Sequence, residues 1–266
     1  MENLLVDKRN GESIKVKVGN VTIGGEKKVI MSGPCSVESY ENMIAIGREL
    51  KSLGVDILRG GAFKPRTSPY DFQGLQYEGL KILNTVGKEV NLPIVTEVMD
   101  TRDIEVCLEY ADMLQIGSRN MYNYSLLKEV GKLKDVPVLL KRGMSATLSE
   151  WLYAAEHIMS QGNTNIVLCE RGIRTFESYT RNTLDLNSVA VIKDKYRLPI
   201  IVDPSHGTGL RELVPIMSMA SIAAGADGLM IESHIQPDHA VSDARQTISM
   251  ESLKTIIDNI QKNTLA

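Results

Sequence analysis

The chain has 266 residues, of which 43% are hydrophobic and 24% charged, so it can bury a core without disulfides or a structural metal. A formal net charge of -3 argues against a general nucleic-acid-binding protein. No apolar run approaches the roughly 18 residues that a membrane-spanning helix needs. The charged amino-terminal segment has no signal-peptide pattern, and three widely spaced cysteines form no disulfide framework. We therefore expect a soluble cytoplasmic protein with no nucleic-acid or membrane partner.

Short apolar segments rich in β-branched residues alternate with longer helical segments. They recur about every 28 residues, which suits one strand, one helix and two loops. Eight strands are predicted: Val29–Ser32, Ile57–Arg59, Ile94–Val98, Met113–Ile116, Val138–Leu140, Ile166–Cys169, Ile200–Val202 and Gly228–Ile231. Eight β/α units predict an α/β fold, a single (β/α)8 or TIM barrel that spans residues 29–266. A doubly wound open sheet is the alternative, but no Gly-x-Gly-x-x-Gly motif follows the first strand.

Two local patterns complete the predicted architecture. The clearest helix is expected at Glu150–Gln161, where apolar residues recur on one face, and Thr147 has the spacing of a capping box with Glu150. Residues 1–28 do not fit the repeat. The patterns of Ser13–Val18 and Val21–Ile23 predict a β-hairpin there, placed at the bottom of the barrel.

Polar and charged residues follow all eight predicted strands, where barrel enzymes carry their active sites. Seven of them are cations: Arg59, Lys64, Arg66, Arg119, Lys141, Arg142 and Arg171. So many positive side chains at one mouth of an acidic protein indicate a small anionic substrate, such as a phosphate or a carboxylate. The alternative for individual members is a salt bridge at the rim, which contributes little.

Four potential metal ligands lie near the ends of neighbouring strands: Cys35, His206, Glu232 and Asp243. A thiolate, an imidazole and two carboxylates suit a divalent transition metal such as Mn²⁺, Fe²⁺, Co²⁺ or Zn²⁺ without selecting one of them. A lone cysteine is more often a small buried hydrophobic residue, and a lone loop histidine is more often merely polar. Cys107, in a helix, and Cys169, in a strand, are interpreted as core residues.

Five motifs stand at the predicted strand ends. They are Gly-Pro-Cys-Ser at 33–36, Arg-Gly-Gly-Ala-Phe-Lys-Pro-Arg-Thr-Ser at 59–68, Ile-Gly-Ser-Arg at 116–119, Leu-Lys-Arg-Gly at 140–143 and Asp-Pro-Ser-His-Gly at 203–207. In sequence and order they resemble type I 3-deoxy-D-arabino-heptulosonate 7-phosphate (DAHP) synthases, in the subgroup close to 3-deoxy-manno-octulosonate 8-phosphate (KDO8P) synthases. The resemblance covers nearly the whole chain from about Val29, and it also implies a (β/α)8 barrel.

The resemblance implies a metal-dependent transferase. Such an enzyme condenses phosphoenolpyruvate with D-erythrose 4-phosphate and water, releasing DAHP and phosphate, as the first step of the shikimate pathway to aromatic amino acids. By motif, the residues that would hold phosphoenolpyruvate are Arg59, Lys64, Arg119, Lys141 and Arg171. Arg66 and Thr67 would hold erythrose 4-phosphate.

The resemblance also implies roles in the chemistry itself. The metal ligands would be Cys35, His206, Glu232 and Asp243. Cys35 and His206 would thereby act as catalytic residues together with Lys64, the expected group for proton transfer. Glu97 matches an acidic position near the reacting carbons.

Two other functions remain as alternatives. One is KDO8P synthase, which uses D-arabinose 5-phosphate, although its members typically carry Ala-Asn where this chain has Pro-Arg at 65–66. The other is a non-catalytic phosphate-binding barrel, which the intact ligand set disfavours. The resemblance implies a homotetramer or homodimer. About 28 residues precede the first barrel strand, too few for a regulatory domain, so we expect little feedback inhibition unless a separate protein supplies it.

Overall fold

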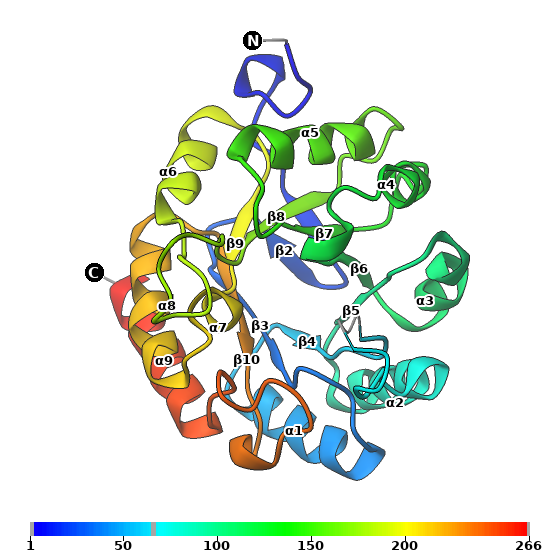
Figure 1. The fold of residues 1–266 in the computed structure, drawn as a ribbon, viewed down its shortest axis with the longest axis vertical. Coiled ribbons are helices and arrows are strands. Elements are labelled where there is room, and N and C mark those ends of the chain that lie inside the picture. Colours follow the sequence, from blue (N-terminus) through cyan, green and yellow to red (C-terminus); the bar gives the residue numbers. More distant parts are fainter. Residues whose placement is uncertain (1–2, 65–67, 265–266) are drawn as a thin grey trace.

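A closed barrel of eight parallel strands forms the centre of the computed structural model, which describes residues 3–64 and 68–264 (Figure 1). The strands are β3 (Val29–Gly33), β4 (Ile57–Arg59), β5 (Ile94–Glu97), β6 (Met113–Ile116), β7 (Val138–Lys141), β8 (Ile166–Glu170), β9 (Ile200–Val202) and β10 (Gly228–Glu232). β10 pairs with β3 from Gly228–Val29 to Glu232–Gly33, which closes the barrel. The predicted (β/α)8 fold is therefore confirmed, and the open-sheet alternative is wrong.

Helices surround the barrel in an outer layer (Figure 1). They are α1 (Tyr40–Ser52), α2 (Gln76–Val90), α3 (Ile104–Tyr110), α4 (Tyr124–Gly131), α5 (Leu148–Met159), α6 (Leu186–Lys195), α8 (Val214–Ala223) and α9 (Met250–Thr264). Their apolar faces pack on outward-facing strand residues such as Leu58 and Leu140. The short α7 (Pro204–Thr208) lies between β9 and α8. Among the described residues, no helix has both the length and the apolar character required to cross a membrane.

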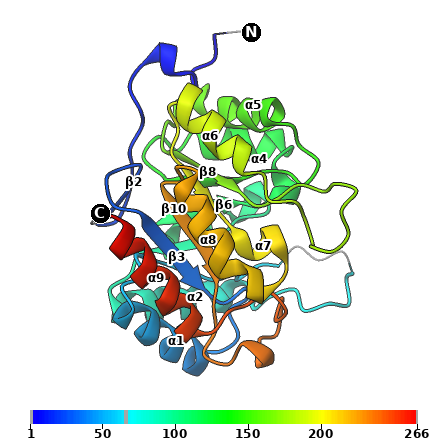
Figure 2. The ribbon, with the colours of Figure 1, turned by 90° about the vertical axis from the view of Figure 1, so that its left-hand side faces the viewer.

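The barrel interior is filled by a second apolar cluster, whose strand members include Met31 and Ile201. β1 (Val16–Val18) and β2 (Val21–Ile23) form the predicted antiparallel hairpin, and apolar side chains of both strands join this inner cluster. In Figure 2 the hairpin lies on the opposite side of the barrel from α7. The hairpin therefore packs against the amino-terminal ends of the strands and leaves their carboxyl ends for the site.

Several element boundaries differ from those expected. Helix α5 occupies Leu148–Met159 instead of Glu150–Gln161, because Thr147 and Glu150 form a complete capping box that starts the helix directly after Thr147. Four strands extend one residue further than predicted and end on Gly33, Lys141, Glu170 and Glu232. Backbone pairing continues there regardless of side-chain polarity, which apolar patterning does not detect.

Candidate active site

A cavity of about 170 Å³ opens where the barrel strands end. All five residues predicted to hold phosphoenolpyruvate line it: Arg59, Lys64, Arg119, Lys141 and Arg171. Three other sequence-derived site residues, Glu97, His206 and Asp243, also line it. Parallel pairing around the barrel brings these side chains, which are far apart in the chain, to one mouth. Arg66 and Thr67 lie outside the described residues.

Cys35, Glu232 and Asp243 form a compact group of potential metal ligands, with one donor atom from each within 4.8 Å of the others. Cys35 follows β3 and Glu232 ends the adjacent β10, so strand pairing sets their proximity. Asp243 has a left-handed backbone (φ 53°), held by the Gln246 and Thr247 amides, which donate to its carbonyl. One thiol and two carboxylates converging on one point fit a divalent transition metal.

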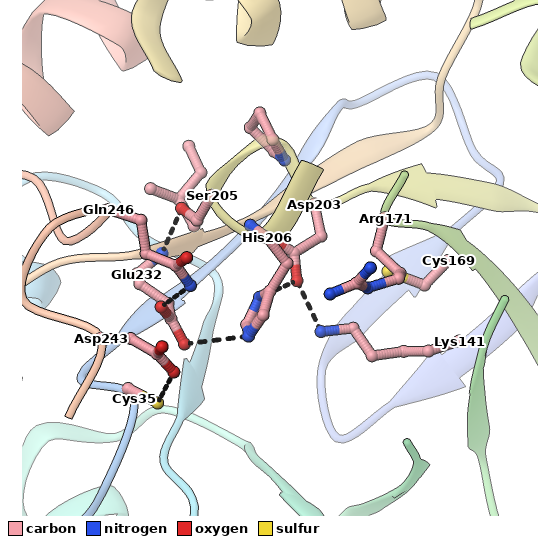
Figure 3. Close-up of polar contacts among 12 residues, drawn as sticks. Cys35, Lys141, Cys169, Arg171, Asp203, Ser205, His206, Glu232, Asp243 and Gln246 are labelled. Atoms are coloured by element: carbon pink, nitrogen blue, oxygen red, sulfur yellow. Dashed lines mark hydrogen bonds and ion pairs between the residues drawn. The ribbon is translucent and has the colours of Figure 1, made fainter. Parts of the chain in front are cut away.

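His206 lies beside this group, with Nε2 3.6 Å from Glu232 Oε1 (Figure 3). It belongs to α7 and not to a loop, because Asp203 caps the helix by accepting a hydrogen bond from the His206 amide. Asp203 also accepts from Nδ1 at 2.7 Å, a bond that directs the Nε2 lone pair toward the ligand group. Burial lowers the pKa of His206, which favours the neutral imidazole that binds metals.

The electrostatics of the group suit a cation. Burial, reinforced by the negative charge of Glu232, raises the pKa of the Cys35 thiol to about 12. Burial also acts to raise the pKa of Asp243, but the nearby His206 and a hydrogen bond from Cys35 Sγ at 3.0 Å lower it to about 2. Lys64 Nζ lies 2.9 Å from the same sulfur atom. A coordinated cation would stabilise the thiolate, which this buried setting otherwise disfavours.

Arg59 and Lys141 are buried and already paired within the site. Arg59 Nη1 donates to Glu232 Oε1 at 2.9 Å and to the Pro34 carbonyl at 2.8 Å. Lys141 pairs with Asp203, the carboxylate that orients His206 (Figure 3). These cations therefore contact a predicted metal ligand or the carboxylate that orients one, and they also line the cavity. Arg119 instead is exposed and forms no ion pair within the described part of the chain.

The structure places Arg142 outside the cavity, although the sequence counts it among the mouth cations. Successive residues at a strand end point to opposite faces, so Lys141 points inward and Arg142 outward. Arg142 forms a buried ion pair with Glu170 and a partly buried one with Asp185, and its guanidinium lies 5.8 Å from the centre of the Trp151 ring. Arg142 thus joins β7 to the helical layer.

The sequence interpretation missed several residues of the site, of which Arg181 and Gln246 contact the predicted metal ligands. Arg181 lines the cavity and donates to Asp243 Oδ1 at 3.2 Å, and Gln246 Nε2 donates to Glu232 Oε2 at 2.6 Å. The sequence signal for Arg181 is the polar run Thr-Arg-Asn-Thr at 180–183, soon after the Arg171 strand end. Gln246 has no such signal, because a glutamine next to a loop carboxylate is common.

Comparison with known proteins places the chain in a defined group. The DAHP synthetase I family matches residues 8–265. The phospho-2-dehydro-3-deoxyheptonate aldolase of Thermotoga maritima is 47% identical over 251 residues, covering 94% of this chain and 74% of the relative. The 2-dehydro-3-deoxyphosphooctonate aldolase of Syntrophotalea carbinolica is 33% identical over 258 residues, covering 90% and 92%.

Solved structures agree with these relationships. The crystal structure of the Thermotoga maritima DAHP synthase matches with a TM-score of 0.95 at 44% identity, covering 99% of this chain and 77% of that chain. A truncated form of the enzyme from the same organism matches with a TM-score of 0.90 at 42% identity and covers 97% of this chain and 95% of that one.

Proposed function

The chain belongs to the DAHP synthetase I family, and we propose that it condenses phosphoenolpyruvate with D-erythrose 4-phosphate and water to form DAHP and inorganic phosphate. One observation carries this proposal: a cavity lined by six cations directly adjoins a group of thiol, carboxylate and imidazole side chains. A cationic cavity alone would suit many phosphates. The adjoining ligand group could in addition hold a divalent metal, which would activate an aldehyde.

Phosphoenolpyruvate carries a phosphate and a carboxylate, and both need cations when they leave water. Lys64, Arg119, Lys141 and Arg171 line the cavity from the ends of different strands, so they can contact the two anionic groups from several sides. Arg59 also lines the cavity, and its Nη1 is paired with Glu232. Such fixed charges also reduce the repulsion between phosphoenolpyruvate and a second phosphorylated substrate, and they orient the reacting carbons.

Cys35, His206, Glu232 and Asp243 would hold the divalent metal, either Mn²⁺, Fe²⁺, Co²⁺ or Zn²⁺. When bound, the metal supplies a Lewis acid that polarises the aldehyde carbonyl. The chain contributes the orientation of these ligands through Asp203 on His206 and through Arg59 on Glu232. The motif resemblance assigns the phosphate of erythrose 4-phosphate to Arg66 and Thr67.

The reaction forms a bond between carbon 3 of phosphoenolpyruvate and the aldehyde carbon. Electrons of the enol double bond make that bond, carbon 2 becomes electron-poor, and water adds to it. The hemiketal phosphate then loses inorganic phosphate and leaves the ketone of DAHP. We infer that Lys64 gives a proton to the former aldehyde oxygen, and its contacts at the metal-ligand group support this role: Nζ lies 3.0 Å from the Cys35 carbonyl oxygen and 2.9 Å from the sulfur.

An assay of the metal-stripped protein tests this function. After EDTA treatment we expect no release of phosphate from phosphoenolpyruvate, and restored release with formation of DAHP when erythrose 4-phosphate and Mn²⁺ are added. The product is identified by mass spectrometry. Absence of DAHP with each of the four metals would contradict the proposal, and so would full activity of Cys35→Ala after metal removal.

The resemblance further supports a cytoplasmic homotetramer or homodimer. Sedimentation velocity at several protein concentrations measures the assembly directly. A species with the mass of one chain, 29.4 kDa, at all concentrations would contradict this part of the proposal.

A further inference from the structure

Arg181 and Gln246 connect two separate loops to the predicted metal ligands. Arg181 lies between β8 and α6, and Gln246 lies between β10 and α9. A single arginine nitrogen, Nη1, donates to Gln246 Oε1 at 2.9 Å and to Asp243 Oδ1 at 3.2 Å. Gln246 Nε2 in turn donates to Glu232 Oε2 at 2.6 Å (Figure 3). The position of one guanidinium therefore affects both carboxylates.

The two partners fix the orientation of the Gln246 amide. A guanidinium only donates hydrogen bonds and an ionised carboxylate only accepts them, so the amide oxygen must face Arg181 and the NH₂ must face Glu232. Gln246 and Glu232 are 2% and 0% exposed, so water does not compete for their bond. The other oxygen of Glu232 accepts from Arg59. The carboxylate plane of Glu232 is therefore held from both sides.

The segment that carries Arg181 is itself anchored to α7. The Arg181 amide donates to the Thr208 carbonyl at 2.9 Å. Gly209, with φ 69°, leaves room for the arginine, since a Cβ there would lie 2.4 Å from the Arg181 Cβ. The next residue, Asn182, donates to the carbonyl of His206 at 2.8 Å. Through Arg181 and Asn182, this short segment is therefore linked to three of the four predicted ligands: to Asp243 directly, to Glu232 through Gln246, and to the backbone of His206.

We propose that Arg181 and Gln246 are positioning residues that hold Asp243 and Glu232 in the geometry required for metal binding. This inference rests on the metal site of the proposed function. Arg181 has two opposing effects on a bound cation, because its charge repels the cation while its hydrogen bonds orient the ligands. The arginine side chain is 39% exposed, so water screens the repulsion and orientation dominates. Gln246 is neutral and contributes orientation alone.

Mn²⁺ titration of the EDTA-treated protein by isothermal calorimetry tests the inference without relying on activity. We expect Gln246→Leu, which preserves size and charge, to raise the Kd for Mn²⁺ about 10- to 100-fold. Arg181→Ala is expected to raise it as well, although the lost charge acts in the opposite direction. Arg174→Ala is the matched control. Arg174 is also an exposed arginine between β8 and α6, but it does not line the cavity. Its Kd should equal that of the original protein.

The outcomes separate this inference from the function on which it rests. If the original protein failed to bind Mn²⁺, the proposed metal site would be wrong. If it bound Mn²⁺ and both variants bound equally well, with unchanged melting temperatures, the positioning role would be wrong.

A double variant tests whether Arg181 and Gln246 act together on the metal ligands. Kinetic measurements test whether Arg181 contacts the substrate directly. When Gln246→Leu is already present, Arg181→Ala should raise the Kd for Mn²⁺ by a smaller factor than it does alone. Fully additive effects would contradict a common action of the two residues. At saturating Mn²⁺ the kcat of Arg181→Ala should recover. A persistent increase in the KM for phosphoenolpyruvate would instead make Arg181 a substrate contact.

Discussion

Arg59 Nη1 lies 2.9 Å from Glu232 Oε1, and this ion pair joins a predicted substrate-binding arginine to a predicted metal ligand. The two side chains are 6% and 0% exposed. The same nitrogen donates to the carbonyl of Pro34, the residue before Cys35. One buried guanidinium therefore connects the predicted phosphoenolpyruvate-binding side of the site to the predicted metal-binding side.

Arg59→Ala should be strongly destabilising in metal-free protein. The change leaves the Glu232 carboxylate buried without its ion-pair partner, and breaking such a pair costs about 3–5 kcal/mol. Urea unfolding of EDTA-treated protein measures the free energy of unfolding. Arg102→Ala is the control, because the Arg102–Asp100 pair is exposed and its loss should leave the urea midpoint unchanged. A midpoint for Arg59→Ala equal to that of the control would show that the buried pair is not structurally important.

Lys64→Ala should lower kcat about 10²- to 10⁴-fold, the range for loss of a group that transfers a proton. The reduction should persist at saturating phosphoenolpyruvate and metal, since the defect lies in the chemical step. Steady-state phosphate release gives kcat and KM separately. Lys81→Ala, which removes an exposed lysine on α2, serves as the control and should retain the original kcat. An unchanged kcat with only a raised KM would limit Lys64 to substrate binding.

Gly117→Ala should impair the site while leaving the fold intact. A Cβ at this position would lie 2.0 Å from Glu97 Oε1, so the carboxylate must move away from its place in the cavity. Because the end of a long side chain moves easily, we expect a melting temperature close to the original and a clear loss of kcat/KM. If activity were unaffected, the position of Glu97 would not matter for the reaction. A crystal structure of the variant would show the displacement directly.

Thr147→Ala should destabilise the protein without altering the site. Thr147 accepts a hydrogen bond from the Glu150 amide and caps α5, on the outside of the barrel. Loss of such a cap should lower Tm by about 2–4 °C in a chain of this size. Calorimetry measures the shift, and kcat/KM at 25 °C should stay the same. An unchanged Tm would mean that the capping box contributes little to the stability of this barrel.

The barrel could be predicted from the sequence because its signal is periodic. Each strand is a short buried run that packs on both faces, so Val138–Leu140 and Ile200–Val202 stand out by composition alone. The position of the site at the carboxyl ends of the strands could be predicted equally well, because polar residues follow these apolar segments. Boundaries are less visible, since backbone pairing continues through Lys141 and Glu170 whatever their side chains are.

The division of roles among neighbouring cations could not be predicted. Lys141 and Arg142 are adjacent and equally charged, yet strand geometry directs one into the cavity and the other to Glu170 in the outer layer. Arg181 and Gln246 are 65 positions apart, and their contact arises only when the loops after β8 and β10 meet. Contacts between loops produce no periodic sequence pattern from which they could be predicted.

The choice of aldose phosphate tests the central claim most directly. Phosphoenolpyruvate-dependent phosphate release should be measured with Mn²⁺ and either D-erythrose 4-phosphate or D-arabinose 5-phosphate over a range of concentrations. We expect a much larger kcat/KM with erythrose 4-phosphate, in agreement with 47% identity to the Thermotoga maritima enzyme against 33% to the Syntrophotalea carbinolica one. A larger kcat/KM with arabinose 5-phosphate would contradict assignment of this barrel as a DAHP synthase.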